Sequence, residues 1–319
     1  MNRFTSFALA AVLAASAAHA EGFPDKPITF VVPFAAGTAT DQIARALGNG
    51  VTAETKQAVV IDNKAGASGF IASQQVAKAP ADGYTVLITT NTTHAANEHL
   101  FKRLPYDPLK DYAPIAALGK GGQIMVVNPS SPAKTVADFV AMAKKSPGKY
   151  SFGSGSSSSR IAGELFQQMA DIKLLHVPYK SNTLAVTDLL GGQIDMMITD
   201  TATGLPQVKS GKLRALGVSG SKRSPLAPEV PTIAEAGVKD YEMGYWFAAY
   251  APARTPPAVV KRLNELLVQA ARSDVAKAAF YEPTGTDVFT TSPEDLAKFQ
   301  AAESQKWGRI VKAAGIEAE

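Results

Sequence analysis

Short apolar runs alternate with stretches of helical periodicity along the first ninety residues. Residues 28–32 form a nearly unbroken apolar run, which is typical of a strand covered on both faces. The run ends at Pro33, and apolar residues then recur at helical spacing from Ile43 to Val51. Further strands are predicted at 58–61 and 84–89, with a helix at 70–78 between them. This strand–helix order predicts a parallel sheet with helices on both faces, an α/β fold.

The loop between the first strand and the first helix, residues 34–41, has the features of an anion site. Thr38 or Thr40 is placed to cap the helix by accepting from its unpaired backbone N–H groups. A strand, a small-residue loop and a capped helix together direct N–H groups into a crevice, where they can hold an anion. Taken alone, the segment also fits an ordinary turn. A ligand crevice is expected beyond the carboxyl ends of parallel strands, where residues 90–94 also lie.

The same alternation begins again in the second half of the chain. Strands are predicted at 123–127, 149–152, 175–177, 194–198, 213–218 and 245–250, and helices at 136–144, 160–169, 183–190, 205–210, 256–271, 275–281 and 293–314. Two similar halves with small-residue loops predict a clamshell with a ligand cleft between its lobes. We expect a first lobe at 21–124, a second at 125–245, and a return to the first lobe with C-terminal helices at 246–319.

The segment Gly153–Ser159, nearly all serine, is the leading candidate for direct ligand contact. Its hydroxyl groups and the N-terminus of the helix predicted after it suit an anion, although glycine–serine stretches are also flexible linkers. Arg160 either grips a carboxylate through its guanidinium group or pairs with a structural acid. Asp200 can pair with Arg160, accept from a ligand amine or cap the next helix. Trp246 is either a flat wall for a ligand or part of the core.

Catalytic and metal-binding patterns are missing from the sequence. His94 and His99 have the wrong spacing for a zinc helix motif, the serines form no G-x-S-x-G elbow, and Gly119–Gly122 lacks the P-loop pattern. We therefore expect a protein that is not an enzyme and that has no catalytic residue, metal or cofactor. The alternative is a hydrolase that uses a serine of Ser154–Ser159 with His94 or His176.

The first twenty residues predict export. Arg3 provides a positive start, residues 7–15 an apolar core, and Ala18-His19-Ala20 a small-x-small cleavage site. Cleavage is expected after Ala20, and the periplasm is the expected location. The chain contains no cysteine, which excludes disulfides, thiol catalysis and cysteine-based metal sites.

Composition fits a globular protein, because 46% of the residues are apolar and 19% are charged. The formal net charge is +4, and the basic residues are spread along the chain without a run or interleaved aromatic residues. A nucleic-acid partner is therefore not expected, and we expect a monomer.

Several segments in this order resemble the periplasmic solute receptors of tripartite tricarboxylate transporters, the Bug family. The segments that carry the resemblance are 27–41, 79–85, 104–108, 162–166, 176–180, 188–195, 211–216, 231–237 and 251–256. The resemblance implies a type II periplasmic binding fold that closes on a small carboxylate, either a dicarboxylate or an aromatic acid. It also implies delivery of the solute to an inner-membrane permease; a sensory receptor that acts on a signalling partner is the alternative.

The resemblance also implies which residues meet the ligand. Carried over by position, they are Phe34, Ala36, Gly37, Thr38, Ala39, Thr40, Asp41, Thr90, Asn91, Thr92, Thr93, Ser154, Gly155, Ser156, Ser157, Ser158, Ser159, Arg160, Tyr179, Lys180, Ser181, Asn182, Thr199, Asp200 and Thr201. Three features depart from the family pattern. Gly37-Thr38-Ala39 replaces a run of glycines, Arg160 stands where histidine is frequent, and Asp200 where asparagine is usual. Arg160 is therefore expected to serve a second acidic group on the ligand.

Overall fold

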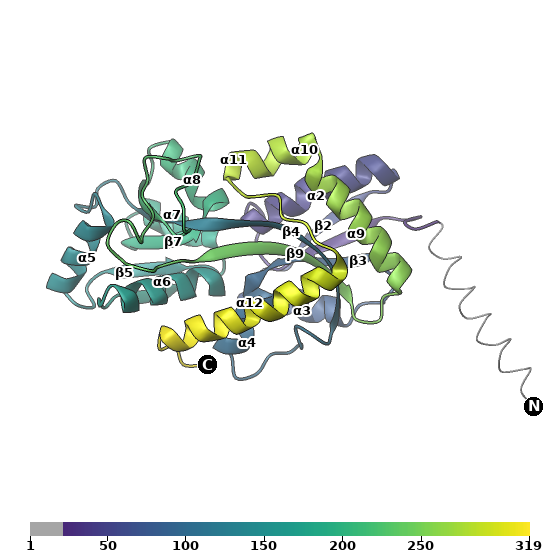
Figure 1. The fold of residues 1–319 in the computed structure, drawn as a ribbon, viewed down its shortest axis with the longest axis horizontal. Helices are drawn as coiled ribbons and strands as arrows, with labels where there is room; N and C mark the ends of the chain where they lie inside the picture. The colour runs from purple at the N-terminus through teal and green to yellow at the C-terminus, as the bar shows by residue number, and fades with distance from the viewer. Residues whose placement is uncertain (1–21) are drawn as a thin grey trace, which may run out of the picture.

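The computed structural model describes residues 22–319, so the predicted signal peptide lies outside the described residues. Within that range the chain forms a mixed α/β fold whose strands follow the order β2-β1-β3-β9-β4-β7-β5-β6, with β8 paired to β4. Figure 1 shows helices on both sides of this twisted sheet. The predicted α/β class is confirmed. No helix of the described part is long and apolar enough to span a membrane.

The first part of the chain forms the parallel end of the sheet. Its elements are β1 (Ile28–Val32), α2 (Ala39–Thr55), β2 (Val59–Asn63), η1 (Ala67–Gly69), α3 (Phe70–Ala77), β3 (Thr85–Thr90), the π-helical turn η2 (Thr92–Ala96) and α4 (Asn97–Leu100). β1 pairs in parallel with both β2 and β3, as the strand–helix order predicts. The carboxyl ends of β1 and β3 therefore lie at the same edge of the sheet.

The middle of the chain builds the other end of the sheet. Its elements are α5 (Val136–Lys145), β5 (Ser151–Ser154), α6 (Ser157–Met169), β6 (Leu175–Pro178), α7 (Asn182–Leu190), β7 (Met196–Asp200), α8 (Thr201–Lys209) and β8 (Arg214–Val218). β5 pairs in parallel with β6 and β7. α6 and α8 begin three and four residues before the predicted helices, because Ser156 and Asp200 cap them.

Two long strands, β4 (Tyr112–Val127) and β9 (Gly244–Pro252), join the two ends of the sheet. The first part of β4 pairs with β9, and the last five residues pair with β7 and β8. The predicted strand 123–127 is too short, because Pro114 and three glycines interrupt the apolar pattern and the ladder to β9 is bulged. The lobe boundaries after 124 and 245 fall inside these strands and stay a prediction.

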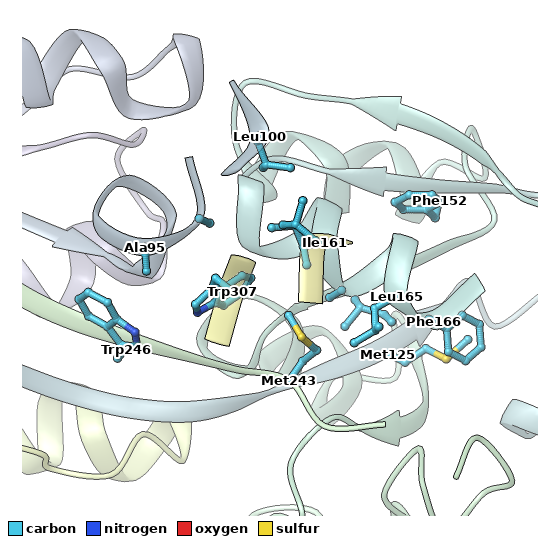
Figure 2. Close-up of a cluster of buried hydrophobic side chains, with 14 of the residues drawn as sticks. Ala95, Leu100, Met125, Phe152, Ile161, Leu165, Phe166, Met243, Trp246 and Trp307 are labelled. Carbon is cyan, nitrogen blue, oxygen red and sulfur yellow. The ribbon is translucent and has the colours of Figure 1, made fainter. Parts of the chain in front are cut away.

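The last part of the chain is helical and returns across the molecule. It contains α9 (Pro257–Arg272), α10 (Asp274–Ala276), η3 (Lys277–Tyr281), α11 (Glu282–Thr284) and α12 (Pro293–Ala313). α12 packs against η2 and β4 and reaches α6 at its far end, as Figure 1 shows. The largest apolar cluster follows it: Figure 2 shows Ala95 and Leu100, Ile161 and Leu165, and Trp307 of α12 within one cluster. Trp246 is buried in this cluster, so the core alternative for it is confirmed.

Candidate functional site

A cavity of about 40 Å³ lies where both ends of the sheet meet the crossing strands. Its lining residues come from the N-termini of α2, α6, α7 and α8, from the end of β3 and from β4 and β9. The predicted ligand-binding residues that line it are Phe34, Thr38, Ala39, Thr40, Thr90, Asn91, Thr92, Gly155, Ser156, Ser158, Asn182 and Asp200. In this conformation the cavity has room for a few water molecules.

The loop before α2 is held by its own side chains. The Thr38 hydroxyl accepts from the backbone N–H of Asp41 and donates to the carbonyl oxygen of Ala35, so Thr38, not Thr40, caps α2. Gly37 has a φ of +81°, which favours glycine, and its N–H donates to Asp41 over 2.9 Å. Ala39 and Thr40, the first two residues of α2, line the cavity, and their N–H groups have no intrahelical partner because they lie in the first turn.

Asp41 is buried behind this loop and does not line the cavity. Burial raises its pKa, but hydrogen bonds from Arg45, Gly37 and Asn63 outweigh that effect, and the pKa is lowered overall. Arg45 lies 2.9 Å from the Asp41 carboxylate. Asp41 therefore fixes the loop, and its charge is matched by Arg45.

The end of β3 supplies two buried polar groups that are not satisfied. The side-chain oxygen Oδ1 of Asn91 accepts from the backbone N–H of Trp246, which fixes the orientation of the amide. The amide nitrogen Nδ2 is then a buried donor, and it has no partner among the described residues. The Thr92 hydroxyl, also fully buried, has no such partner either. Each group lines the cavity. Leaving a buried donor unpaired costs about 1–3 kcal/mol, so these two groups mark a place for a ligand.

The serine-rich segment is ordered: Gly153 and Ser154 end β5, and Ser157–Ser159 begin α6. Ser156 caps α6 in a capping box with Ser159, and Ser157 donates to Asn97 Oδ1 over 2.7 Å. The Ser158 hydroxyl accepts from Gln123 Nε2 at 3.1 Å and lines the cavity. The flexible-linker alternative is therefore wrong for this segment, because each of its hydroxyl groups from 156 to 159 has a partner within the fold.

Asp200 has the capping role that was one of its three predicted roles. Its Oδ1 accepts from the backbone N–H of Thr203 at 2.8 Å, at the start of α8. Its Oδ2 accepts from Asn182 Nδ2 at 3.0 Å, and Asn182 in turn accepts from the backbone N–H of Gly155. Asp200 also lines the cavity, so the cap and the cavity wall are the same carboxylate.

Three further lining residues were not predicted: Gln123, Tyr245 and Phe247. They belong to β4 and β9, and the sequence analysis predicts strands at 123–127 and 245–250 without assigning them a ligand contact. Gln123 is the one of the three with a signal in the sequence, because it is a polar residue that opens an apolar run. The Tyr245 hydroxyl lies 2.9 Å from Thr201 Oγ1, which ties β9 to the start of α8.

A second cavity of about 410 Å³ shares Phe34, Gly155 and Ser156 with the first. The predicted residues Ser154, Ser157, Arg160, Tyr179 and Lys180 line only this one. The remaining predicted residues, Ala36, Gly37, Asp41, Thr93, Ser159, Ser181, Thr199 and Thr201, line neither.

Arg160 forms an ion pair with Glu319 across the second cavity. Pairing with an acid, one of the two alternatives predicted for Arg160, is therefore present, with Glu319 and not with Asp200. Its Nε is buried and has no hydrogen-bond partner among the described residues. A contact between Arg160 and a second acidic group of the ligand stays a prediction.

The two histidines of the hydrolase alternative are poor bases. His176 Nε2 lies 2.7 Å from Ser154 Oγ, but burial and the charge of Arg160 lower the pKa of His176 to about 4. His94 is stacked on Tyr250 at 3.9 Å, and burial lowers its pKa to about 3. A general base works best when its pKa lies near the working pH, so neither histidine is well suited to activate a serine at neutral pH.

We expect His94 to make the fold acid-sensitive. In the unfolded chain the His94 side chain is protonated below about pH 6.5, whereas in the folded chain its pKa is lowered to about 3. The contribution of His94 is therefore constant above pH 6.5, and it falls by up to about 1.4 kcal/mol per pH unit below it. In urea titrations, His94→Phe should show a loss between pH 7 and pH 5 that is smaller than in the wild type by about 2 kcal/mol. Equal losses in both proteins would contradict this.

A scan against family models matches residues 43–316 to the model described as tripartite tricarboxylate transporter family receptor. The chain belongs to this receptor family. The resemblance drawn from the sequence segments is therefore confirmed. Members of the receptor family are solute-binding proteins and not enzymes.

Solved structures agree with the assignment to this receptor family. The fold is similar to R. palustris Rpa4515 with adipate, at 34% identity and a TM-score of 0.90 over 93% of this chain and 100% of that one. It is similar to the periplasmic binding protein BugD, at 31% identity and a TM-score of 0.89 over 93% and 100%. It is also similar to MatC from Rhodopseudomonas palustris with bound malate, at 28% identity and a TM-score of 0.86 over 91% and 100%.

Proposed function

We propose that this receptor captures a small carboxylate in the first cavity and delivers it to the membrane permease of a tripartite tricarboxylate transporter. The observation that carries the proposal is the pair of unsatisfied buried groups, Asn91 Nδ2 and Thr92 Oγ1, on the wall of the cavity. A carboxylate oxygen is an acceptor, and it would satisfy both. The helices α2 and α6 begin at the wall of the same cavity, and their N-termini favour a negative charge there.

The relatives support this ligand class, because Rpa4515 was solved with adipate and MatC with malate. Export, cleavage after Ala20 and delivery to a permease instead of a signalling partner are parts of the proposal. N-terminal sequencing of the protein from a periplasmic extract should begin at Glu21.

A thermal-shift panel of organic acids, sugars and amines tests the ligand class. A ligand at 100 times its dissociation constant stabilises the folded state by about 2.7 kcal/mol, which raises the melting temperature measurably. We expect at least one small carboxylate to give such a shift and neutral sugars to give none. A panel in which only sugars or amines without a carboxylate stabilise the protein would refute the proposal.

The same ligand also separates a receptor from a hydrolase. A receptor needs a difference in affinity between its conformations and no stabilisation of a transition state. We therefore expect the bound acid to be recovered chemically unchanged after long incubation. Turnover that Ser154→Ala removes would show that the Ser154–His176 pair is catalytic.

A further inference from the structure

The charges around the first cavity are one-sided. Among the described residues that line it, Asp200 is the only one of the Asp, Glu, Lys, Arg and His types. The two basic residues predicted to meet the ligand, Arg160 and Lys180, line the second cavity instead. Asp41 lies behind the loop and is paired with Arg45. The lining of a cavity proposed for an anion therefore carries one formal negative charge and no formal positive charge.

The Asp200 carboxylate is held in a fixed orientation with acceptor capacity left over. It accepts from Thr203 N–H, from Asn182 Nδ2 and, more weakly at 3.4 Å, from Thr199 Oγ1. An ionised carboxylate offers about four acceptor sites, so at least one remains for a group in the cavity. The N-terminus of α8 offsets only about half of its charge.

Gln123 lies beside Asp200 and extends the same wall. The two residues are register partners on the neighbouring strands β4 and β7. Gln123 donates through Nε2 to Ser158, while its Oε1 is buried and has no partner among the described residues. This wall therefore presents two acceptors. Asn91 and Thr92 present hydrogen-bond donors to the cavity, so a ligand must place an acceptor there and a donor at Asp200 and Gln123.

We propose that the ligand of this cavity carries a protonated amine as well as a carboxylate, and that Asp200 is the residue that selects the amine. The inference rests on the proposed function, because the same cavity must hold the carboxylate. An ammonium group has three donors and no acceptor, so it satisfies both Asp200 and Gln123 Oε1. A second carboxylate in that position would be repelled by the like charge of Asp200 and would offer no donor to Gln123 Oε1. The substrate class is thus a small amino acid or another aminocarboxylate.

Matched pairs of acids with and without an amino group test the selection directly. Suitable probes are aspartate with succinate, glutamate with glutarate, and 6-aminohexanoate with hexanoate, each titrated by calorimetry. The wild-type protein should bind the amino member of at least one pair tenfold or more tightly, as a charge-assisted contact implies. Asp200→Asn keeps one side-chain oxygen to cap α8 and loses the oxygen that accepts from Asn182 Nδ2, so it should fold with reduced stability and lose most of that preference.

The outcomes separate this inference from the proposed function. If carboxylates bind but no amino member is preferred, or if Asp200→Asn keeps the preference, the inference is wrong and the receptor for a small carboxylate stands. If none of the acids nor any other carboxylate binds, both are wrong. The melting temperature of unliganded Asp200→Asn shows whether the variant is folded, and the wild-type comparison needs no variant at all.

Discussion

Thr92→Val should weaken carboxylate binding about 10- to 100-fold without destabilising the unliganded protein. The Thr92 hydroxyl is buried at the cavity wall with no partner among the described residues, so its burial lowers the free energy of unfolding of the unliganded protein. A hydrogen bond to a charged group is worth about 1.5–3 kcal/mol, which the valine cannot supply. Because threonine and valine have the same shape, the free energy of unfolding should stay equal or rise by about 1 kcal/mol. Calorimetry and urea unfolding measure the two quantities.

The next residue offers a matched control with the opposite signature. The Thr93 hydroxyl lies 2.6 Å from Thr89 Oγ1 and 2.8 Å from His94 Nδ1, and Thr93 does not line the cavity. Thr93→Val should therefore lose about 1–3 kcal/mol of stability and bind ligand nearly as well as the wild type. If Thr92→Val destabilises the protein and binds normally, Thr92 has a structural role and not a binding role.

Gly155→Ala should destabilise the protein by about 2–3 kcal/mol or more and reduce binding at least tenfold. A Cβ atom at residue 155 would lie 1.9 Å from the carbonyl carbon of Ser181 and 2.1 Å from the backbone nitrogen of Asn182. The start of α6 must then move away from the start of α7. That movement breaks the hydrogen bond from Gly155 N–H to Asn182, which orients the amide that holds Asp200. Thermal unfolding and ligand titration measure both effects.

Gly191→Ala is the matched control for this substitution. Gly191 follows α7 with a φ of −79°, and the nearest atom to an added Cβ is 3.6 Å away. The control should stay within about 0.5 kcal/mol of the wild type. If Gly155→Ala were equally mild, the close approach of the two helix starts would not be required for the site.

Much of the fold could be predicted from local patterns. The runs 28–32 and 245–250 are apolar because they are covered on both faces, and they form β1 and the centre of β9. The first part of β4 was not predicted, because Pro114 and Gly119–Gly122 interrupt the apolar pattern that indicates a strand. Pairing with β9 is what makes this part of the chain a strand. The predicted starts of α6 and α8 were several residues too late, because the capping residues Ser156 and Asp200 lie well before the first apolar residues of these helices.

The candidate site could be predicted in part. The loops at the strand ends were found because small residues and hydroxyl groups gather after β1, β3 and β5, and many of these residues line one cavity. Gln123, Tyr245 and Phe247 were missed, because residues in crossing strands carry no loop signal. Pairing with Arg160 was one of the three roles predicted for Asp200, but Arg160 lines the neighbouring cavity and pairs with Glu319.

The sequence by itself determined the α/β class, the family and the loops that carry the site, because periodicity, capping residues and ordered short segments are local properties of the chain. Tertiary structure alone decided which hydroxyl groups form hydrogen bonds within the protein and which remain unpaired. Thr92 and Thr93 are adjacent and chemically identical, yet only Thr92 lacks a partner among the described residues. The physical reason is that only the folded backbone decides which groups lie within hydrogen-bond distance: the π-helical turn places Thr93 against Thr89 and His94, and β9 places the Trp246 N–H against Asn91.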